Sequence, residues 1–150
     1  MTTIINDTEF RRALEGLDAS QQRAVAALFV GNVLSLSDDE RVARVVKVAA
    51  NSDASDNELA DALHTAKAAT SDCHTRCGAA GDWAEQAGYF VARAAVAAVT
   101  PEWQTTSGPA LQAAMSSRMA QTCQSIVSGE DTAGQESREQ YRILSEFLNS

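Results

Sequence analysis

The side chains best suited to chemistry in this chain lie in one short segment, DCHTRC at residues 72–77. Cys73 and Cys77 are four residues apart, and on a helix this spacing directs both thiols to the same side, with His74 at its edge. Thiolate and imidazole groups are ligands of zinc, and Cys123 from a later helix could join them. The segment therefore admits two functional hypotheses, a zinc site and a thiol that senses redox state.

A purely structural role explains the same spacing without a cofactor. Structural zinc sites usually carry their cysteines as CxxC pairs, and an interval of four residues is an uncommon variant. Cys73 and Cys77 also fall on the apolar stripe of their helix, where cysteine commonly acts as a small hydrophobic residue. We therefore predict that both thiols are buried and that the chain holds no cofactor, and the zinc or redox site is the alternative.

The sequence gives little support to catalysis. It contains no Ser-His-Asp context, no glycine-rich phosphate loop, no HExxH motif and no ExxH pair of the kind that binds iron in helical bundles. His64 falls on the polar face of its helix and cannot share a site with Cys73. A non-enzymatic protein is the favoured interpretation, with an enzyme or a small-ligand pocket between helices as a further alternative.

Trp103 stands in the longest irregular stretch, TPEWQTTSG at residues 100–108. A tryptophan in such a loop has two explanations. It folds back to cover the end of the helical bundle, which is the more common outcome, or it serves as an anchor for a partner protein, because tryptophan is enriched in interface hot spots. We therefore include Trp103 in the candidate protein-binding surface.

The charge of the chain restricts the partners that we expect. It carries 20 acidic against 12 basic residues, a formal net charge of −8, and no basic stripe, so neither nucleic acid nor an anionic membrane surface is expected. A basic protein partner would suit this charge, since complementary charge accelerates encounter. Asp38 and Asp39 belong to the one short acidic cluster and are included in the candidate binding surface. Association of identical chains stays open.

The elements that position these residues are predicted to be helices. On a helix, residues 83–99 (WAEQAGYFVARAAVAAV) place their polar positions in one narrow strip, and such a nearly all-apolar helix belongs at the centre of a bundle. Alanine, the best helix former, dominates the apolar composition. We predict one all-α domain over residues 1–150, a bundle of about six to seven helices around this central helix. Gly88, between Ala84 and Ala92, is expected to allow close approach of another helix.

Local signals set the expected helix limits. Ser37 with Glu40 and Ser55 with Glu58 have the spacing of capping boxes, and Gly78 is expected to end the helix that the second box begins. Residues 128–134 (SGEDTAG) are predicted to be a flexible linker before the last helix. The helix before that linker is expected to present its larger apolar side chains on one face: Leu111, Met115, Met119, Thr122 and Ile126.

The cellular compartment is expected to be the cytoplasm. The first residues, MTTIINDTEF, lack the basic and apolar regions of a signal peptide. Three cysteines leave one over after any single pairing, which favours a reducing environment.

Three segments within residues 39–99, DERVARVVKVA, NELADALHTAKAA and AEQAGYFVARAAVAA, resemble alanine-rich helical segments of bacterial immunity proteins and of uncharacterised bacterial proteins. The resemblance implies a protein that binds a cognate toxin and catalyses nothing. The sequence therefore favours a non-enzymatic helical interaction module, an immunity or regulatory protein that binds a basic partner.

Overall fold

A computed structural model describes the backbone of residues 2–80 and 82–150, and the side chains of this part except for 77–80. Within the described residues the chain forms seven α-helices and two short 3-10 helices, without a β-strand, which confirms the predicted all-α bundle. None of these helices combines the length and apolarity that a bilayer crossing requires. The elements are α1 Asp7–Glu15, α2 Ala19–Val33, η1 Leu34–Leu36, α3 Glu40–Ala50, α4 Asp56–Ala80, α5 Trp83–Val99, η2 Glu102–Gln104, α6 Pro109–Ser128 and α7 Thr132–Leu148.

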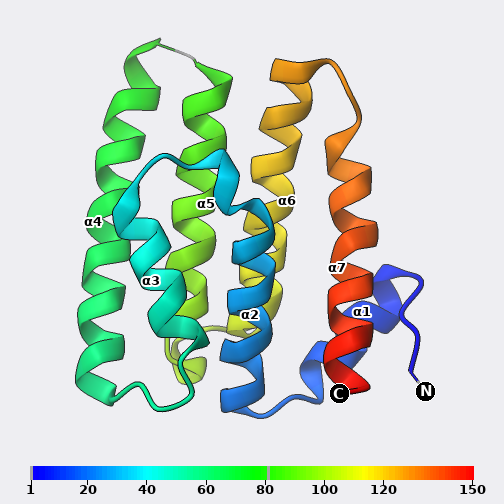
Figure 1. Ribbon diagram of the computed structural model, residues 1–150. Coiled ribbons are helices and arrows are strands. Elements are labelled where there is room, and N and C mark those ends of the chain that lie inside the picture. Colours follow the sequence, from blue (N-terminus) through cyan, green and yellow to red (C-terminus); the bar gives the residue numbers. More distant parts are fainter. Residues whose placement is uncertain (1, 81) are drawn as a thin grey trace.

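The helices are arranged in two layers (Figure 1). One layer is the row α4, α5, α6 and α7, in which each helix packs on the next, and α2 and α3 cover one face of that row. The two ends of the chain lie close together beside the short α1 (Figure 1). The Thr2 N–H donates to Asn149 Oδ1 at 2.9 Å, and Asn149 Nδ2 donates to the Thr2 carbonyl at 2.7 Å, so the N-terminal segment is bound to the end of α7.

The helix α5 is the centre of the bundle, as predicted. It packs against α4 and α6 within its own layer and against α2 and α3 in the other. Only its first turn and Arg93 are exposed, because the remaining circumference is apolar or small. Its buried residues are Ala87, Val91, Ala92, Ala94, Ala95, Ala97, Ala98 and Val99.

The buried face of α6 is not the one that the larger apolar residues indicate. Met119 and Ile126 are exposed, whereas Ala113, Ala114 and Ala120 are fully buried. Small side chains let the α6 backbone approach the alanine-rich α5 closely, and large ones at the same positions would hold the two helices apart. The predicted stripe is therefore correct for Leu111 but wrong for Met119 and Ile126.

One of the two predicted capping boxes forms. The Ser55 hydroxyl accepts the Glu58 N–H at 3.1 Å, and the Glu58 carboxylate accepts the Ser55 N–H at 3.2 Å. The other prediction is wrong, because Asp39 caps α3 by accepting the Arg41 N–H at 2.9 Å. Ser37 instead accepts the N–H of Asp39 at 3.2 Å, in the bend that follows η1.

Two predicted helix limits are also wrong. The helix α4 continues through Gly78 to Ala80, since one glycine inside a helix costs only about 1 kcal/mol relative to alanine. The expected linker 128–134 is largely helical. Gly129 ends α6 with a left-handed backbone (φ 76°), and the Ser125 hydroxyl then accepts the N–H of Thr132 at 3.0 Å, so that α7 begins there.

Gly88 does not face another α-helix. A Cβ built at this glycine would lie 3.6 Å from the Leu36 carbonyl oxygen, an ordinary van der Waals distance, so η1 is its neighbour. Ala84, one turn earlier, is exposed. Of the predicted ridge, Ala84 and Gly88 therefore do not face another α-helix, whereas Ala92 is fully buried.

Candidate functional site

Trp103 lies in η2, the single turn between α5 and α6, and its side chain is 81% exposed. The Gln104 N–H donates to the Pro101 carbonyl at 3.0 Å, and the Gly108 N–H donates to the Thr105 hydroxyl at 3.1 Å, which fixes the loop around it. The expectation that this tryptophan covers the end of the bundle is wrong, because the turn directs the indole away from the core. The alternative, that Trp103 is an anchor for a partner protein, is compatible with this exposure.

Trp103 lines a groove of about 920 Å³ at the end of the bundle where α4 begins and α5 finishes. Leu59 and Leu63 of α4 line its wall, together with Val99 and Pro101 from the end of α5. Most cavities of this size that bind ligands or peptide side chains are similarly apolar, with a few polar groups at the rim. The groove is therefore a surface against which an apolar side chain of another molecule can pack.

The charged groups that line this groove are mainly acidic. Asp56 and Glu102 have no ion-pair partner in the described part of the chain. Arg23 also lines the groove, but its guanidinium donates to the carbonyls of Ala49 at 3.1 Å and Asn51 at 2.9 Å. The cation is therefore used to hold α2 to the end of α3, and the two carboxylates are left to interact with a ligand.

Asp38 and Asp39 lie at the other end of α3 and do not line the groove. Asp39 pairs with Arg41 at 2.8 Å, and this hydrogen-bonded guanidinium holds the pKa of the Asp39 carboxyl below its usual value. Arg41 also pairs with Asp72 of α4 at 2.9 Å. Asp39 thus serves the start of α3 and its attachment to α4, while Asp38 is exposed beside it.

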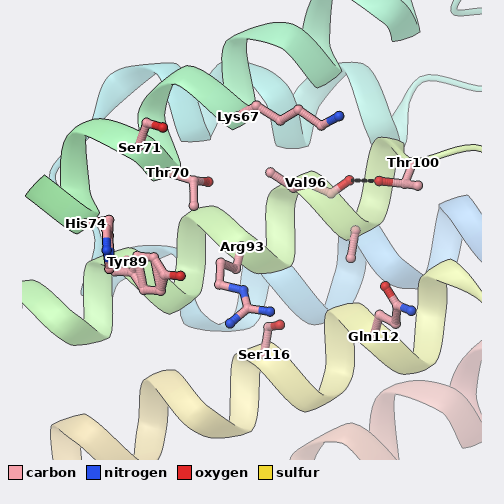
Figure 2. Close-up of a pocket in the computed structure, with 11 residues that line it drawn as sticks. Lys67, Thr70, Ser71, His74, Tyr89, Arg93, Val96, Thr100, Gln112 and Ser116 are labelled. Atoms are coloured by element: carbon pink, nitrogen blue, oxygen red, sulfur yellow. Dashed lines mark hydrogen bonds between the residues drawn. The ribbon is translucent and has the colours of Figure 1, made fainter. Parts of the chain in front are cut away.

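Among the described side chains, the candidate metal and redox residues Cys73, His74 and Cys123 do not form a group that could hold a metal ion. Cys73 is buried and its sulfur accepts a hydrogen bond from Arg76 at 3.3 Å, whereas His74 is exposed, with its ring centroid 5.5 Å from that of Tyr89 (Figure 2). Burial raises the pKa of the Cys123 thiol on α6, which disfavours the thiolate that a metal would need. The side chain of Cys77 lies outside the described residues. Among the described residues, no three His, Cys, Asp or Glu side chains are close enough to hold a metal ion.

The sequence interpretation missed a buried carboxyl group, Glu136 of α7, which is 2% exposed. Asn32 of α2 donates to its Oε2 at 2.9 Å, and Gln140 donates to its Oε1 at 3.3 Å. Burial nevertheless raises the pKa of Glu136 above its usual value. The signal was present in the sequence, since Glu136 and Gln140 share the helical spacing of the buried Ile143 and Leu144.

No protein family, curated protein or solved structure matches the chain.

Proposed function

We propose that the protein is a non-enzymatic interaction module that binds a basic segment of a partner protein in the groove beside Trp103. The observation that carries the proposal is the 81% exposure of this indole above an apolar groove. Tryptophan buries about 150–250 Å² when it is covered, which at about 25 cal/mol per Å² is on the order of 4–6 kcal/mol before the costs of association. A side chain of this kind is a typical hot spot.

The charge around the groove defines the partner. Asp56 and Glu102 line it, and the exposed Asp53 lies in the segment just before α4. With a net charge of −8 on the whole chain, a segment that carries lysine or arginine next to an apolar residue would complement this surface. A toxin bound by an immunity protein, or an effector bound by its regulator, is a partner of this chemistry. Such a role agrees with the resemblance of residues 39–99.

The chain provides its own matched control, because it has only two tryptophans. Trp83 is also partly exposed, at 44%, but it lies at the start of α5 and does not line the groove. Wild-type protein, Trp103→Ala and Trp83→Ala are used as baits in native lysate, and the retained protein is then purified and titrated. We expect wild type and Trp83→Ala to bind it alike, and Trp103→Ala to lose about tenfold or more in affinity.

Three results would contradict the proposal. The first is that every protein retained from the lysate by the wild-type bait is also retained by the Trp103→Ala bait. The second is a purified partner that binds Trp103→Ala as tightly as wild type. The third is self-association of the purified wild type that Trp103→Ala abolishes, which would assign the groove to a second copy of the chain.

A further inference from the structure

A second hollow, a cleft of about 540 Å³, lies along α5 between α4 and α6 (Figure 2). No residue of α2 or α3 lines it, since these helices cover the other face of the row. Each helix contributes positions three or four residues apart, which form one continuous face on a helix. The positions are Lys67, Thr70, Ser71 and His74 on α4, Tyr89, Arg93, Val96, Ala97 and Thr100 on and directly after α5, and Gln112 and Ser116 on α6.

The charge of this cleft is opposite to that of the chain. Lys67 and Arg93 line it, His74 adds a ring nitrogen, and none of the lining residues is an aspartate or glutamate. In a chain with 20 acidic and 12 basic residues, a hollow without a carboxylate stands out from the surrounding surface. Such a concentration of cations attracts an anion.

Neither cation of the cleft is paired with a carboxylate among the described residues. In the described part of the chain neither Lys67 nor Arg93 forms an ion pair or a hydrogen bond, whereas Arg41, Arg118 and Arg142 all pair with carboxylates. The Arg93 guanidinium lies 5.8 Å from the centroid of the Tyr89 ring, and this aromatic contact positions the group without occupying its N–H donors. In Figure 2 the guanidinium points toward the side of the cleft where Ser116 lies.

Neutral donors and an apolar floor complete the cleft. The hydroxyls of Ser71, Tyr89 and Ser116 have no hydrogen-bond partner among the described residues, and all three line the cleft. Thr100, in contrast, donates its hydroxyl to the Val96 carbonyl at 2.6 Å and offers only an acceptor. Val96 supplies apolar surface beside these groups.

We propose that this cleft is a binding site for a small organic anion. Its phosphate or carboxylate group is held by the fork of Arg93, with Ser116 of α6 as a further donor. Lys67 adds positive charge from the α4 side of the cleft, and the apolar part of the ligand packs against Tyr89 and Val96. The volume lies within the range of about 300–1,000 Å³ that small-molecule sites occupy. The proposal is independent of the protein groove, because Thr100 alone lines both hollows and neither tryptophan lines the cleft.

Four probes test the site by two-dimensional NMR at constant ionic strength: phenyl phosphate, benzoate, inorganic phosphate and, as a neutral control, phenol. We expect phenyl phosphate or benzoate to saturate at millimolar concentration or below, with shifts concentrated on residues 67–74, 89–100 and 112–116. The probe of these two that binds more tightly identifies the preferred anionic group. A comparison of phenyl phosphate with inorganic phosphate shows how much the ring contributes to the affinity. Failure of all three anions to saturate below about 10 mM would overturn the proposal, as would equal binding of phenol.

Variants then locate the site on particular residues. Arg93→Gln is expected to weaken the binding of the tighter-binding probe about tenfold. Arg93→Lys is expected to restore part of that affinity, because lysine keeps the charge but not the fork of N–H donors. Lys67→Gln is expected to weaken the binding several-fold. The matched control is Lys47→Gln, an equal loss of charge at an exposed position of α3 that does not line the cleft. If Lys47→Gln weakens binding as much as Arg93→Gln does, the anion is responding to overall charge and the proposal is wrong.

Discussion

An exposed indole adds little to folding, and the stability of a Trp103 variant can therefore be separated from its binding. We expect Trp103→Ala to change the free energy of unfolding by less than about 0.5 kcal/mol, as is usual for surface positions. Phe10→Ala should cost about 3–5 kcal/mol, because that ring is fully buried with its centroid 5.6 Å from those of Phe29 and Tyr141. Urea denaturation of both variants measures the difference. A loss above about 2 kcal/mol in Trp103→Ala would mean that the indole packs on the bundle in solution.

Glu136 is expected to make the stability of the protein depend on pH. Burial raises the pKa of this carboxyl in the folded state, so the folded protein holds its proton more tightly than the unfolded chain does. The contribution of Glu136 to stability is therefore complete at low pH and is lost as the pH rises through the folded-state pKa. The difference in unfolding free energy between wild type and Glu136→Gln, measured from about pH 4 to about pH 8, should shift against the wild type as the pH rises.

Glu139, on the same helix, is the control of opposite sign. Its hydrogen bond from Arg142 lowers the pKa of the Glu139 carboxyl, so its contribution is present at neutral pH and is lost as the pH falls. Glu139→Gln should therefore differ from wild type in the opposite direction. A wild type and Glu136→Gln that keep the same difference at every pH would show that the raised pKa is absent in solution.

The two serines of the predicted capping boxes are expected to contribute different amounts to the stability of the protein. Ser55→Ala should cost about 1 kcal/mol, because the variant leaves the Glu58 N–H of the first turn of α4 without its acceptor. Ser37→Ala should cost less than about half of that, since Asp39 is the cap of α3 and remains in place. Thermal denaturation of both variants measures the contrast. Equal losses would mean that α3 begins at Ser37 in solution.

Gly88 offers a stabilising change within α5. The Cβ of alanine would meet only the Leu36 carbonyl, at 3.6 Å, and alanine is better than glycine in a helix interior by about 0.8–1.0 kcal/mol. Gly88→Ala should therefore raise the stability by an amount approaching that value, as measured by chemical denaturation. A lower stability of Gly88→Ala would show that the Leu36 carbonyl lies closer to Gly88 in solution than this distance.

Helices were predictable from the sequence because their signals are local. The apolar circumference of residues 83–99 and the pairing of Ser55 with Glu58 each depend on a few neighbouring positions. The burial of α6 was not predictable in the same way. Met119 and Ile126 suggest one apolar face and Ala113 and Ala120 another, and only the close approach of the alanine-rich α5 decides between them. That a segment is helical followed from its own residues. Which face of the helix is buried depended on the neighbouring helix.

The same distinction explains what the sequence could say about the sites. Trp103 was identifiable as a candidate because it is a tryptophan in an irregular segment, yet its exposure depends on where η2 directs it. Lys67 and Arg93 look like isolated surface cations on two different helices. They become one feature only when α4 and α6 flank α5, and this requires the order of helices in the row. Residues that the fold brings to one cleft from different helices have no characteristic spacing in the sequence.

The two layers of helices leave two different surfaces open to a ligand. The covering helices α2 and α3 bury one face of the row, and the groove beside Trp103 opens at the end of the bundle where α2 and α4 begin. The other face of α5 carries the cationic cleft. The two surfaces differ in charge, because Asp56, Glu102 and Arg23 line the groove, whereas Lys67 and Arg93 line the cleft without a carboxylate. Each surface can be altered without the other.

The net charge of −8 gives the last prediction, which concerns the rate at which the partner of the Trp103 groove binds. If that partner is basic, long-range attraction raises the association rate constant, and salt should lower it markedly between about 0.05 M and 0.5 M ionic strength. Glu102→Gln should lower the association rate constant at low salt, because it removes one charge that lines the groove. Trp103→Ala should instead raise the dissociation rate constant, since an apolar anchor acts after contact is made. Stopped-flow measurements of the three proteins across this salt range separate the two effects, and an association rate that does not change with salt would exclude a basic partner.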